Sequence, residues 1–341
     1  MQFFPTRRGW FRLVLTVLLL ALAATGFVAY MTAMPGHSFS GTLPPLSAEE
    51  SEIRKNLASH VNYLAGTIGE RNMIAYQQLL QTAQYIEDKF KNFGYQVRSQ
   101  EYILETRKVR NLIAEIPRSS RASEIVIVGA HYDTVYDCPG ADDNTTGVAA
   151  LLELARLLKN SHPARTIRFV AFVNEEPPWF QTANMGSWVY AKEARRKKEN
   201  IVAAISLETI GMYSDAEGSQ KYPEGFKALY PSKGNFIAFV GNLASHGLVR
   251  DAVRSFRAAT QFPSEGSAAP GWITGVGWSD HWSFWQEGYP AIMVTDTAPF
   301  RNPNYHEPTD KPDTLDYDRM ARVTRGLMSV VQGLGYSKSK E

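Results

Sequence analysis

A histidine and an acid suited to metal chemistry follow a hydrophobic run near the middle of the chain. Residues 124–128 lead into Gly-Ala-His131-Tyr-Asp133, and a second acidic cluster at residues 141–144 follows a short Pro-Gly loop. Imidazole and carboxylate together suit zinc or a similar divalent ion, and a strand end holds a ligand more rigidly than a free loop does. Asp133 stands where its carboxylate can accept the second ring N–H of His131 and fix the tautomer.

The same residues also fit an ordinary polar turn between a strand and a helix. In that interpretation Asp142 or Asn144 is the N-cap of the apolar helix that follows, and His131 has no chemical role. A His-x-Asp pattern is weak evidence by itself, so the rest of the chain must decide between the two interpretations.

Further acids and a second histidine also follow segments with the pattern of strands. Glu175 and Glu176 follow a buried strand that ends at Val173, Glu208 ends another apolar strand, and His306 lies in a polar loop after a third. Adjacent carboxylates at the end of a buried strand are costly unless something neutralises them, and a metal ion does so directly. Because neighbouring side chains point in different directions, one acid can bind metal while the other handles a water molecule.

Each of these residues alone fits a solvated turn or a surface position, but their joint placement favours a metal site. His131, Asp143, Glu176, Glu208 and His306 all follow strands at one predicted edge of a sheet. Two histidines and three carboxylates, one of them bridging, suit a co-catalytic pair of divalent ions. The remaining acid of the pair at residues 175–176 is then free for proton transfer.

The elements that must position these residues alternate between strands and helices. Ser47 and Glu50 form a capping box at the start of a first helix, and a hairpin of strands precedes the alternation. This order predicts an α/β fold with a mixed, mainly parallel sheet and helices on both faces, where ligands gather outside the carboxyl ends of the strands. The predicted strands are 96–104, 111–116, 124–128, 166–173, 201–207, 235–240 and 291–295, and the predicted helices are 76–92, 148–158, 183–198, 245–260, 281–287 and 317–332.

Several motifs together resemble a known family. The resemblance extends over roughly residues 47–334 and is to the di-zinc exopeptidase family that includes bacterial leucyl aminopeptidases and glutamate carboxypeptidase II. The motifs that carry it are Gly-Ala-His131-Tyr-Asp133, Gly140-Ala-Asp142-Asp143-Asn144-Thr-Thr-Gly147, Asn174-Glu175-Glu176, Met185-Gly186-Ser187, Ser279-Asp280-His281 and Tyr305-His306. Because the motifs occur in the order of the family, their combination is highly specific.

The resemblance implies a three-layer zinc-exopeptidase fold that holds two Zn²⁺ ions per chain, although other divalent ions are possible. It implies that His131 and Glu176 bind one zinc ion, that Glu208 and His306 bind the other, and that Asp143 bridges them. The family commonly has Asp where this chain has Glu208, so this ligand reaches one methylene further.

The resemblance also implies the catalytic residues. Glu175 is expected to act as general base and acid, and Asp133 is expected to orient His131. Tyr305 is expected either to donate a hydrogen bond to the oxyanion or simply to pack in the loop. The family further implies a cis peptide bond between Asp143 and Asn144.

Neighbouring residues have structural interpretations of their own. Pro177 and Pro178 replace the small residues that are usual after the paired acids, which is expected to alter the specificity pocket. Ser279 or Asp280 is expected to cap the next helix, and a direct role for His281 is the less favoured interpretation.

The predicted activity is that of a metallo-exopeptidase that removes residues from peptide ends, most simply from the amino end. Three alternatives remain open. A glutaminyl cyclase has a related zinc fold but needs one ion. Deacylases and dipeptidases also use His-x-Asp but lack the Ala-Asp-Asp-Asn segment. A catalytically dead receptor-like ectodomain would have lost ligands, and here none is missing.

The amino-terminal part of the chain predicts a membrane anchor. A basic segment, residues 1–12, precedes an uncharged apolar run at residues 13–31, which just spans a hydrocarbon core of roughly 30 Å. The basic flank should stay cytoplasmic, which places the catalytic domain in the periplasm or on the cell surface. A cleaved signal peptide, giving a secreted protein, is the alternative. Residues 32–46 are predicted to be an extended linker, and residues 47–337 the peptidase domain.

The composition narrows the other partners. The net charge of the 341 residues is only +2, so no strong positive field recruits nucleic acid. Cys138 is the only cysteine, which excludes an intrachain disulfide bond, and it is interpreted as a small loop residue rather than a ligand. The side-chain specificity depends on the loops 213–232 and 262–278. These loops carry no readable code, and the sequence also leaves the oligomeric state open.

Overall fold

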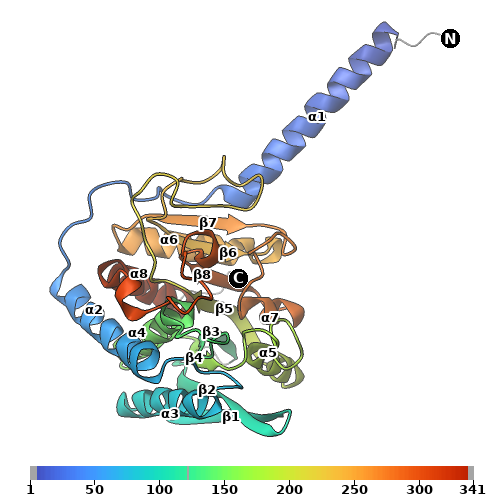
Figure 1. Ribbon diagram of the computed structural model, residues 1–341. Helices are drawn as coiled ribbons and strands as arrows, with labels where there is room; N and C mark the ends of the chain where they lie inside the picture. The colour runs from blue at the N-terminus through green and yellow to red at the C-terminus, as the bar shows by residue number, and fades with distance from the viewer. Residues whose placement is uncertain (1–5, 121–122, 337–341) are drawn as a thin grey trace.

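The computed structural model describes residues 6–120 and 123–336. One sheet of eight strands, in the order β1-β2-β4-β3-β5-β8-β6-β7, crosses the domain between helices (Figure 1). Residues 1–5 of the expected basic segment and residue 337 of the expected domain lie outside the described residues. The strands are β1 (Val97–Leu104), β2 (Arg107–Ile116), β3 (Glu124–His131), β4 (Thr166–Phe172), β5 (Asn200–Glu208), β6 (Ile237–Gly241), β7 (Ser264–Ala268) and β8 (Ala291–Thr295).

The sheet is mixed and mainly parallel, as the sequence predicts. Strand β3 pairs in parallel with β4 and β5, and β5 pairs in parallel with β8, so these four neighbours end at one edge of the sheet. Strands β1 and β2 form the expected hairpin, and β2 joins β4 in antiparallel register. Because each of the four parallel strands precedes predicted site residues, the topology gathers those residues at that edge.

Helices cover both faces of the sheet, which confirms the expected three layers. Alternate residues of β3 separate the two cores, since Val128 and Ala130 belong to the cluster that includes α4 whereas Ile125 and Ile127 belong to the cluster that includes α5 and α7. In Figure 1, α2, α4 and α8 lie on the left of the sheet and α5 and α7 on the right. The helices of the domain are α2 (Ala48–Val61), α3 (Tyr76–Asn92), α4 (Gly147–Leu158), α5 (Gly186–Arg196), α6 (His246–Ala259), α7 (His281–Gln286) and α8 (Tyr317–Tyr336).

The local signals at the start of the domain are confirmed, and one strand departs from the prediction. Ser47 and Glu50 form both hydrogen bonds of the capping box at α2. Strand β7, Ser264–Ala268, lies within a stretch that the sequence predicts as a loop. Its small and polar residues carry no strand pattern, and the segment is extended because the neighbouring edge of β6 offers hydrogen-bonding partners along its whole length.

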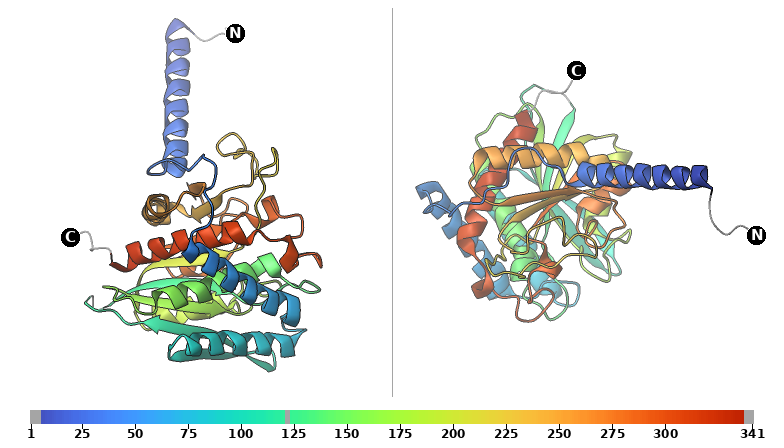
Figure 2. Two further views of the ribbon diagram at one scale, coloured as in Figure 1. Left: turned by 90° about the vertical axis from the view of Figure 1, so that its left-hand side faces the viewer. Right: turned by 90° about the horizontal axis from the view of Figure 1, so that it is seen from above.

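The apolar amino-terminal run forms helix α1 (Arg7–Thr32), which projects away from the domain (Figure 2). Among the described residues it is the one helix long and apolar enough to cross a membrane. The segment that follows it is extended but does not hang free. Arg257 donates hydrogen bonds of 3.1 Å to the carbonyl oxygens of Pro35 and Gly36, and Arg322 contacts the carbonyl of Pro44. The expected linker therefore lies along the domain surface.

Candidate metal centre

Two histidines approach opposite oxygens of one buried carboxylate. Nε2 of His131, at the end of β3, lies 3.3 Å from Oδ1 of Asp143, and Nε2 of His306 lies 3.1 Å from Oδ2. His131 and Asp143 are buried, whereas the side chain of His306 is partly exposed. Asp143 thus occupies the central position between two imidazole groups that come from distant parts of the chain.

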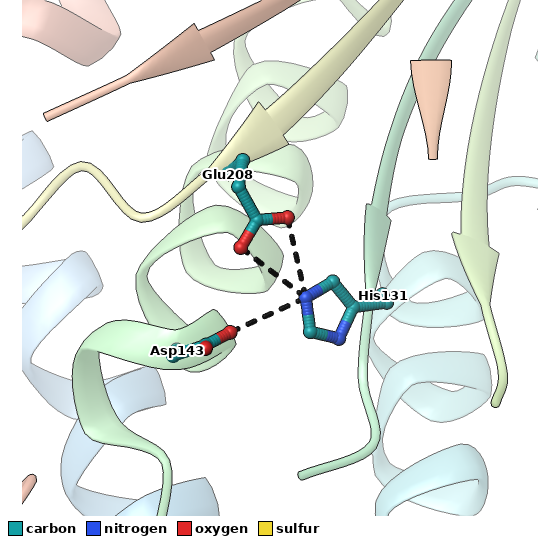
Figure 3. Close-up of side chains that lie close together, drawn as sticks. All are labelled: His131, Asp143 and Glu208. Atoms are coloured by element: carbon teal, nitrogen blue, oxygen red, sulfur yellow. Dashed lines mark hydrogen bonds and ion pairs between the residues drawn. The ribbon is translucent and has the colours of Figure 1, made fainter. Parts of the chain in front are cut away.

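Each histidine also faces a second carboxylate. His131 Nε2 lies 3.3 Å from Oε2 of Glu208 at the end of β5, as Figure 3 shows. His306 Nε2 lies 3.4 Å from Oε2 of Glu176, which follows β4. Among the described residues, His131, Asp143 and Glu208 form one group of closely spaced ligand atoms, Asp143, Glu176 and His306 form another, and a third group joins His131 to Glu175 and Glu176. Among the close ion-pair contacts, Nε2 of His131 lies with Glu208 and not with Glu176, the acid that the resemblance implies as its partner.

The physical reason for this difference lies in side-chain direction. Strand β3 is flanked by β4 on one side and β5 on the other, so both acids are topological neighbours of His131. Only the three-dimensional direction of each side chain decides which acid faces Nε2 of His131. The carboxylate of Glu208 does so, while that of Glu176 turns towards His306.

The donor set fits divalent cations. Among the described residues, Oδ1 of Asp143, Oε1 of Glu176 and Nε2 of His306 are buried polar atoms without a hydrogen-bond partner. Four carboxylates, those of Asp143, Glu175, Glu176 and Glu208, are buried around the two imidazoles. Burial raises the pKa of Glu176 to about 8, and the charge of Asp143 adds to the rise. Such a concentration of buried acids is stable only with compensating positive charge, which bound cations supply.

Asp133 holds the two acids that follow β4. Its Oδ1 and Oδ2 accept hydrogen bonds of 3.1 Å from the backbone nitrogens of Glu175 and Glu176, respectively. The expected contact with His131 is longer than a hydrogen bond, since Nδ1 lies 3.7 Å from Oδ1. Asp133 thus lies on the correct side of the ring, but its hydrogen bonds go to the backbone of the paired acids.

Glu175 lies beside both groups. Its Oε2 is 3.9 Å from Nε2 of His131, and it belongs with His131 and Glu176 to a third set of closely spaced ligand atoms. Burial raises the pKa of Glu175 well above its ordinary value; His131 opposes this rise, and the charges of Glu176 and Glu208 add to it. A buried carboxyl group of this kind is suited to exchanging protons with a neighbouring water.

The loop that carries Asp143 is tied to distant segments. The peptide bond between Asp143 and Asn144 is cis, as the resemblance implies. Oδ1 of Asn144 accepts hydrogen bonds from the backbone nitrogens of Gly147 and Thr209, and Oδ2 of Asp310 accepts one from the backbone nitrogen of Asp143. These contacts connect the loop to the end of β5 and to the segment beyond β8.

Asp142, the neighbour of Asp143, faces away from the candidate metal centre. Its Oδ1 accepts a hydrogen bond of 3.0 Å from the backbone nitrogen of Gly211, and its Oδ2 accepts one of 2.7 Å from Asn302. The N-cap residue of helix α4, Thr146, makes no side-chain cap hydrogen bond, but Oδ1 of Asn144 accepts one of 3.1 Å from the backbone nitrogen of Gly147, the first residue of the helix. Asn144, and not Asp142, therefore satisfies a donor at this end of α4.

Arg71 is a buried organiser of this loop that the sequence analysis missed. Its guanidinium donates to the carbonyl oxygens of Gly69, Tyr132, Pro139 and Gly140 and to the hydroxyl of Thr145. Burial lowers its pKa to about 10, so the group stays charged at neutral pH. The residues next to Arg71 in the sequence give no indication of this role, because all of its partners except Gly69 are more than 60 residues away along the chain.

Ser279 has a different role from the expected helix cap. Its hydroxyl donates a hydrogen bond of 2.6 Å to Oε2 of Glu208, and so positions the acid that is one methylene longer than the Asp of the family pattern. Asp280 is the N-cap residue before α7, but its side chain makes no capping hydrogen bond. His281 packs edge to face on Trp285, with Nε2 2.8 Å from the carbonyl oxygen of Val276, which favours the structural interpretation of this residue.

The remaining residues noted in the sequence lie near the edge of the site. The ring of Tyr305 stacks on that of His306 with centroids 3.8 Å apart, and burial raises the pKa of Tyr305. Cys138 is a free, buried cysteine whose Sγ contacts the carbonyl oxygen of Glu307 at 3.2 Å. Cys138 lies in the loop after β3 and belongs to none of the ligand groups of the described residues.

An apolar pocket opens beside the metal centre. It encloses about 840 Å³ of empty space, including its mouth, and Glu208 and Tyr305 line its inner end. Both loops named in the sequence analysis contribute to it, whereas Pro177 and Pro178 do not. The apolar and aromatic side chains of its walls are Tyr222, Pro223, Phe226, Tyr230, Phe236, Val240, Ile273, Val276, Trp278, Met293 and Phe300.

A mixed sheet that presents histidines and buried carboxylates along one edge is the architecture of a metallopeptidase. The model of peptidase family M28 matches residues 111–331, well over half of the chain, and the chain belongs to this family. It is therefore a peptide hydrolase, and the family resemblance found in the sequence is confirmed.

Curated relatives align with more of the chain than the family model matches. The chain is 37% identical over 296 residues to the uncharacterized protein YfbL of Escherichia coli, covering 84% of this chain and 89% of YfbL. It is 25% identical over 333 residues to leucine aminopeptidase 1 of Arthroderma otae, covering 92% and 81%.

Solved structures share the fold. BSAP, a zinc aminopeptidase from Bacillus subtilis, has a TM-score of 0.64 at 16% identity, covering 84% of this chain and 96% of that one. A glutaminyl cyclase from Fimbriiglobus ruber has a TM-score of 0.61 at 21% identity, covering 86% and 98%. At such low identity these two likenesses show the fold alone.

Proposed function

We propose that this peptidase is an aminopeptidase that uses two zinc ions and a glutamate base. The observation that carries the proposal is the position of Asp143, whose two carboxylate oxygens face His131 and His306 separately. A single ion would need only one of these faces, whereas a bridging carboxylate between two imidazoles suits a co-catalytic pair.

The ligands then divide as the geometry groups them. His131 and Glu208 would hold one ion, Glu176 and His306 would hold the other, and Asp143 would be the ligand that they share. Zinc is proposed because imidazole nitrogen and carboxylate oxygen are among its usual ligands and because BSAP, which shares the fold, is a zinc aminopeptidase. When bound, the ions lower the pKa of a water molecule and polarise the scissile carbonyl.

The residues of this chain perform the proton transfers. Glu175 takes a proton from the attacking water and returns it to the amine that leaves, a dual role that suits a buried carboxyl group. Asp133 keeps the backbone of Glu175 in place through the hydrogen bond described above. Tyr305, which lines the pocket beside Glu208, is proposed to donate a hydrogen bond to the oxyanion.

The amino end of the peptide is proposed as the target because of a relative and the position of the pocket. Glu208 lines the apolar pocket and its carboxylate faces His131, so the pocket opens directly onto the proposed metal centre. Leucine aminopeptidase 1, a relative that aligns with most of the chain, is named as an aminopeptidase. The side chain of the first residue of the peptide would enter the apolar pocket.

The enzyme is proposed to work at the outer side of a membrane. Helix α1 would cross the bilayer through residues 13–31, and the arginines before it would stay in the cytoplasm. The peptidase domain, residues 47–337, would then lie in the periplasm or on the cell surface. A cleaved segment would instead release the domain.

The test combines metal analysis with a substrate panel on the full chain in detergent. The proposal expects about two zinc ions per chain, release of the first residue from unblocked peptides, and no reaction with the same peptides after N-acetylation. A glutaminyl cyclase, the second candidate that the shared fold allows, would bind one ion and convert N-terminal glutamine to a cyclic product with release of ammonia. That result would replace the aminopeptidase proposal.

A further inference from the structure

The outer wall of the apolar pocket is built on the edge strand β7. Glu265, Gly266 and Ser267 of β7 line the pocket, and β7 is the last strand of the sheet. Its far side therefore has no neighbouring strand in the order of the described sheet. The residues that pack on the far side of β7 therefore determine how rigidly this wall of the pocket is held.

The last turn of α1 packs behind this wall. Met31 is only 6% exposed and forms a buried cluster with Ala269 and Val276, whereas Leu20, further up the same helix, is 65% exposed. Val276 of this cluster also lines the pocket. So do three of the partly buried apolar side chains that pack against the cluster, namely Phe226, Val240 and Ile273.

The segment after α1 continues along β7. A Cβ atom added to Gly266 would lie 2.7 Å from Cγ of Met34, so Met34 rests directly on the backbone of the wall. The hydroxyl of Ser38 accepts a hydrogen bond of 2.9 Å from the backbone nitrogen of Ser264. In Figure 1 this segment leaves α1 beside β7 and passes over the same end of the domain. The chain between anchor and domain thus covers the outer side of the pocket wall.

We propose that the end of the membrane anchor supports the wall of the specificity pocket. Met31 acts as a positioning residue: it supports Val276 and its neighbours, and these shape the space for a large apolar first side chain. The anchor and the selection of substrate are then coupled, and cleavage after residue 33 would remove the support behind the pocket wall. The proposal rests on the proposed aminopeptidase function for the identity of the ligand.

The test uses the full chain in detergent and compares Met31→Ala with the conservative Met31→Leu. Leu20→Ala is the matched control, since it removes an apolar side chain of α1 outside the domain contact. The substrates are p-nitroanilides of phenylalanine, leucine and alanine. For Met31→Ala we expect KM to rise about tenfold for phenylalanine and leucine, the effect of roughly one misplaced methylene group in an apolar pocket. We expect kcat to stay within about twofold, and the alanine substrate to be unaffected.

Rescue and binding complete the test. Met31→Leu should restore the KM for phenylalanine, and Leu20→Ala should leave it unchanged. Equal changes for large and small substrates, or no change at all, would overturn the proposal. Calorimetric binding of free L-phenylalanine gives a second measurement that needs no turnover. If neither the wild type nor any variant hydrolyses a substrate, the aminopeptidase proposal fails. Weaker phenylalanine binding in Met31→Ala that Met31→Leu restores would still support the role of Met31 behind the pocket wall. Unchanged binding in Met31→Ala refutes it.

Discussion

Oδ1 of Asp133 accepts a hydrogen bond of 3.1 Å from the backbone nitrogen of Glu175. This contact joins the end of β3 to the end of β4, and it holds the carboxyl group of Glu175 beside Nε2 of His131. A proton-transfer group works best when its position is held by the surrounding structure. The backbone of the proposed base is therefore held by a side chain from the adjacent strand.

Replacing Glu175 by Gln should abolish most of the activity without emptying the site. The amide keeps the size of the side chain but cannot accept the proton of the water, so kcat should fall by about 10²- to 10⁴-fold. Metal analysis should still find close to two ions per chain, because the five proposed ligands remain. Glu101→Gln, an exposed change on β1, is the control and should behave as the wild type. Full activity of Glu175→Gln would exclude Glu175 as the base.

Double variants can establish how the ligands divide between the ions. His131→Ala combined with Glu208→Ala should remove one ion and leave the other, since both residues face the same position. His131→Ala combined with Glu176→Ala should remove both ions. Zinc content per chain after dialysis measures each outcome. If the variant that lacks His131 and Glu176 keeps one ion and the variant that lacks His131 and Glu208 loses both, His131 and Glu176 bind the same ion, as the family resemblance implied.

Arg71→Met should destabilise the domain strongly. The change leaves the carbonyl oxygens of Tyr132, Pro139 and Gly140 without their charged donor, and a buried acceptor left unsatisfied costs about 1–3 kcal/mol. Arg54→Met is the matched control, because Arg54 pairs with Asp318 at the exposed surface and should cost less than about 1 kcal/mol. Urea unfolding followed by tryptophan fluorescence measures both losses. Equal losses would contradict the organising role of Arg71.

His60 should make the protein less stable in mild acid. Burial lowers its pKa to about 4, and the charges of Lys89 and Arg156 add to this, while Nδ1 contacts the hydroxyl of Tyr85 at 2.7 Å. The ordinary pKa of histidine is 6.5, so between pH 6.5 and pH 4 the unfolded chain binds a proton that the folded chain does not. Stability therefore falls as the pH falls through this window.

The size of this effect can be isolated with a single substitution. At pH 5 the contribution of His60 amounts to about 2 kcal/mol relative to neutral pH. His60→Asn removes the titrating group, so the free energy of unfolding of this variant should decrease by that much less between pH 7 and pH 5. Urea unfolding at both pH values gives the difference. Identical pH dependence in variant and wild type would show that His60 binds its proton equally well in both states.

The sequence by itself determined the elements and the chemical groups of the site. Hydrophobic periodicity and the capping box are local properties of the chain, so the helices and most strands follow from neighbouring residues. The ligand types were evident as well, because His131, the paired acids and Glu208 all stand at the ends of apolar runs. The one missed strand, β7, has no such pattern and depends on the edge of β6.

Only the tertiary structure decided how these groups meet. The pairing of His131 with Glu208, the hydrogen bond from Ser279 to that acid and the contacts of Arg71 join segments far apart in the chain. The packing of Met31 behind the pocket has the same character. Such contacts depend on the direction of each side chain after the sheet has formed. Spacing along the chain carries no information about that direction.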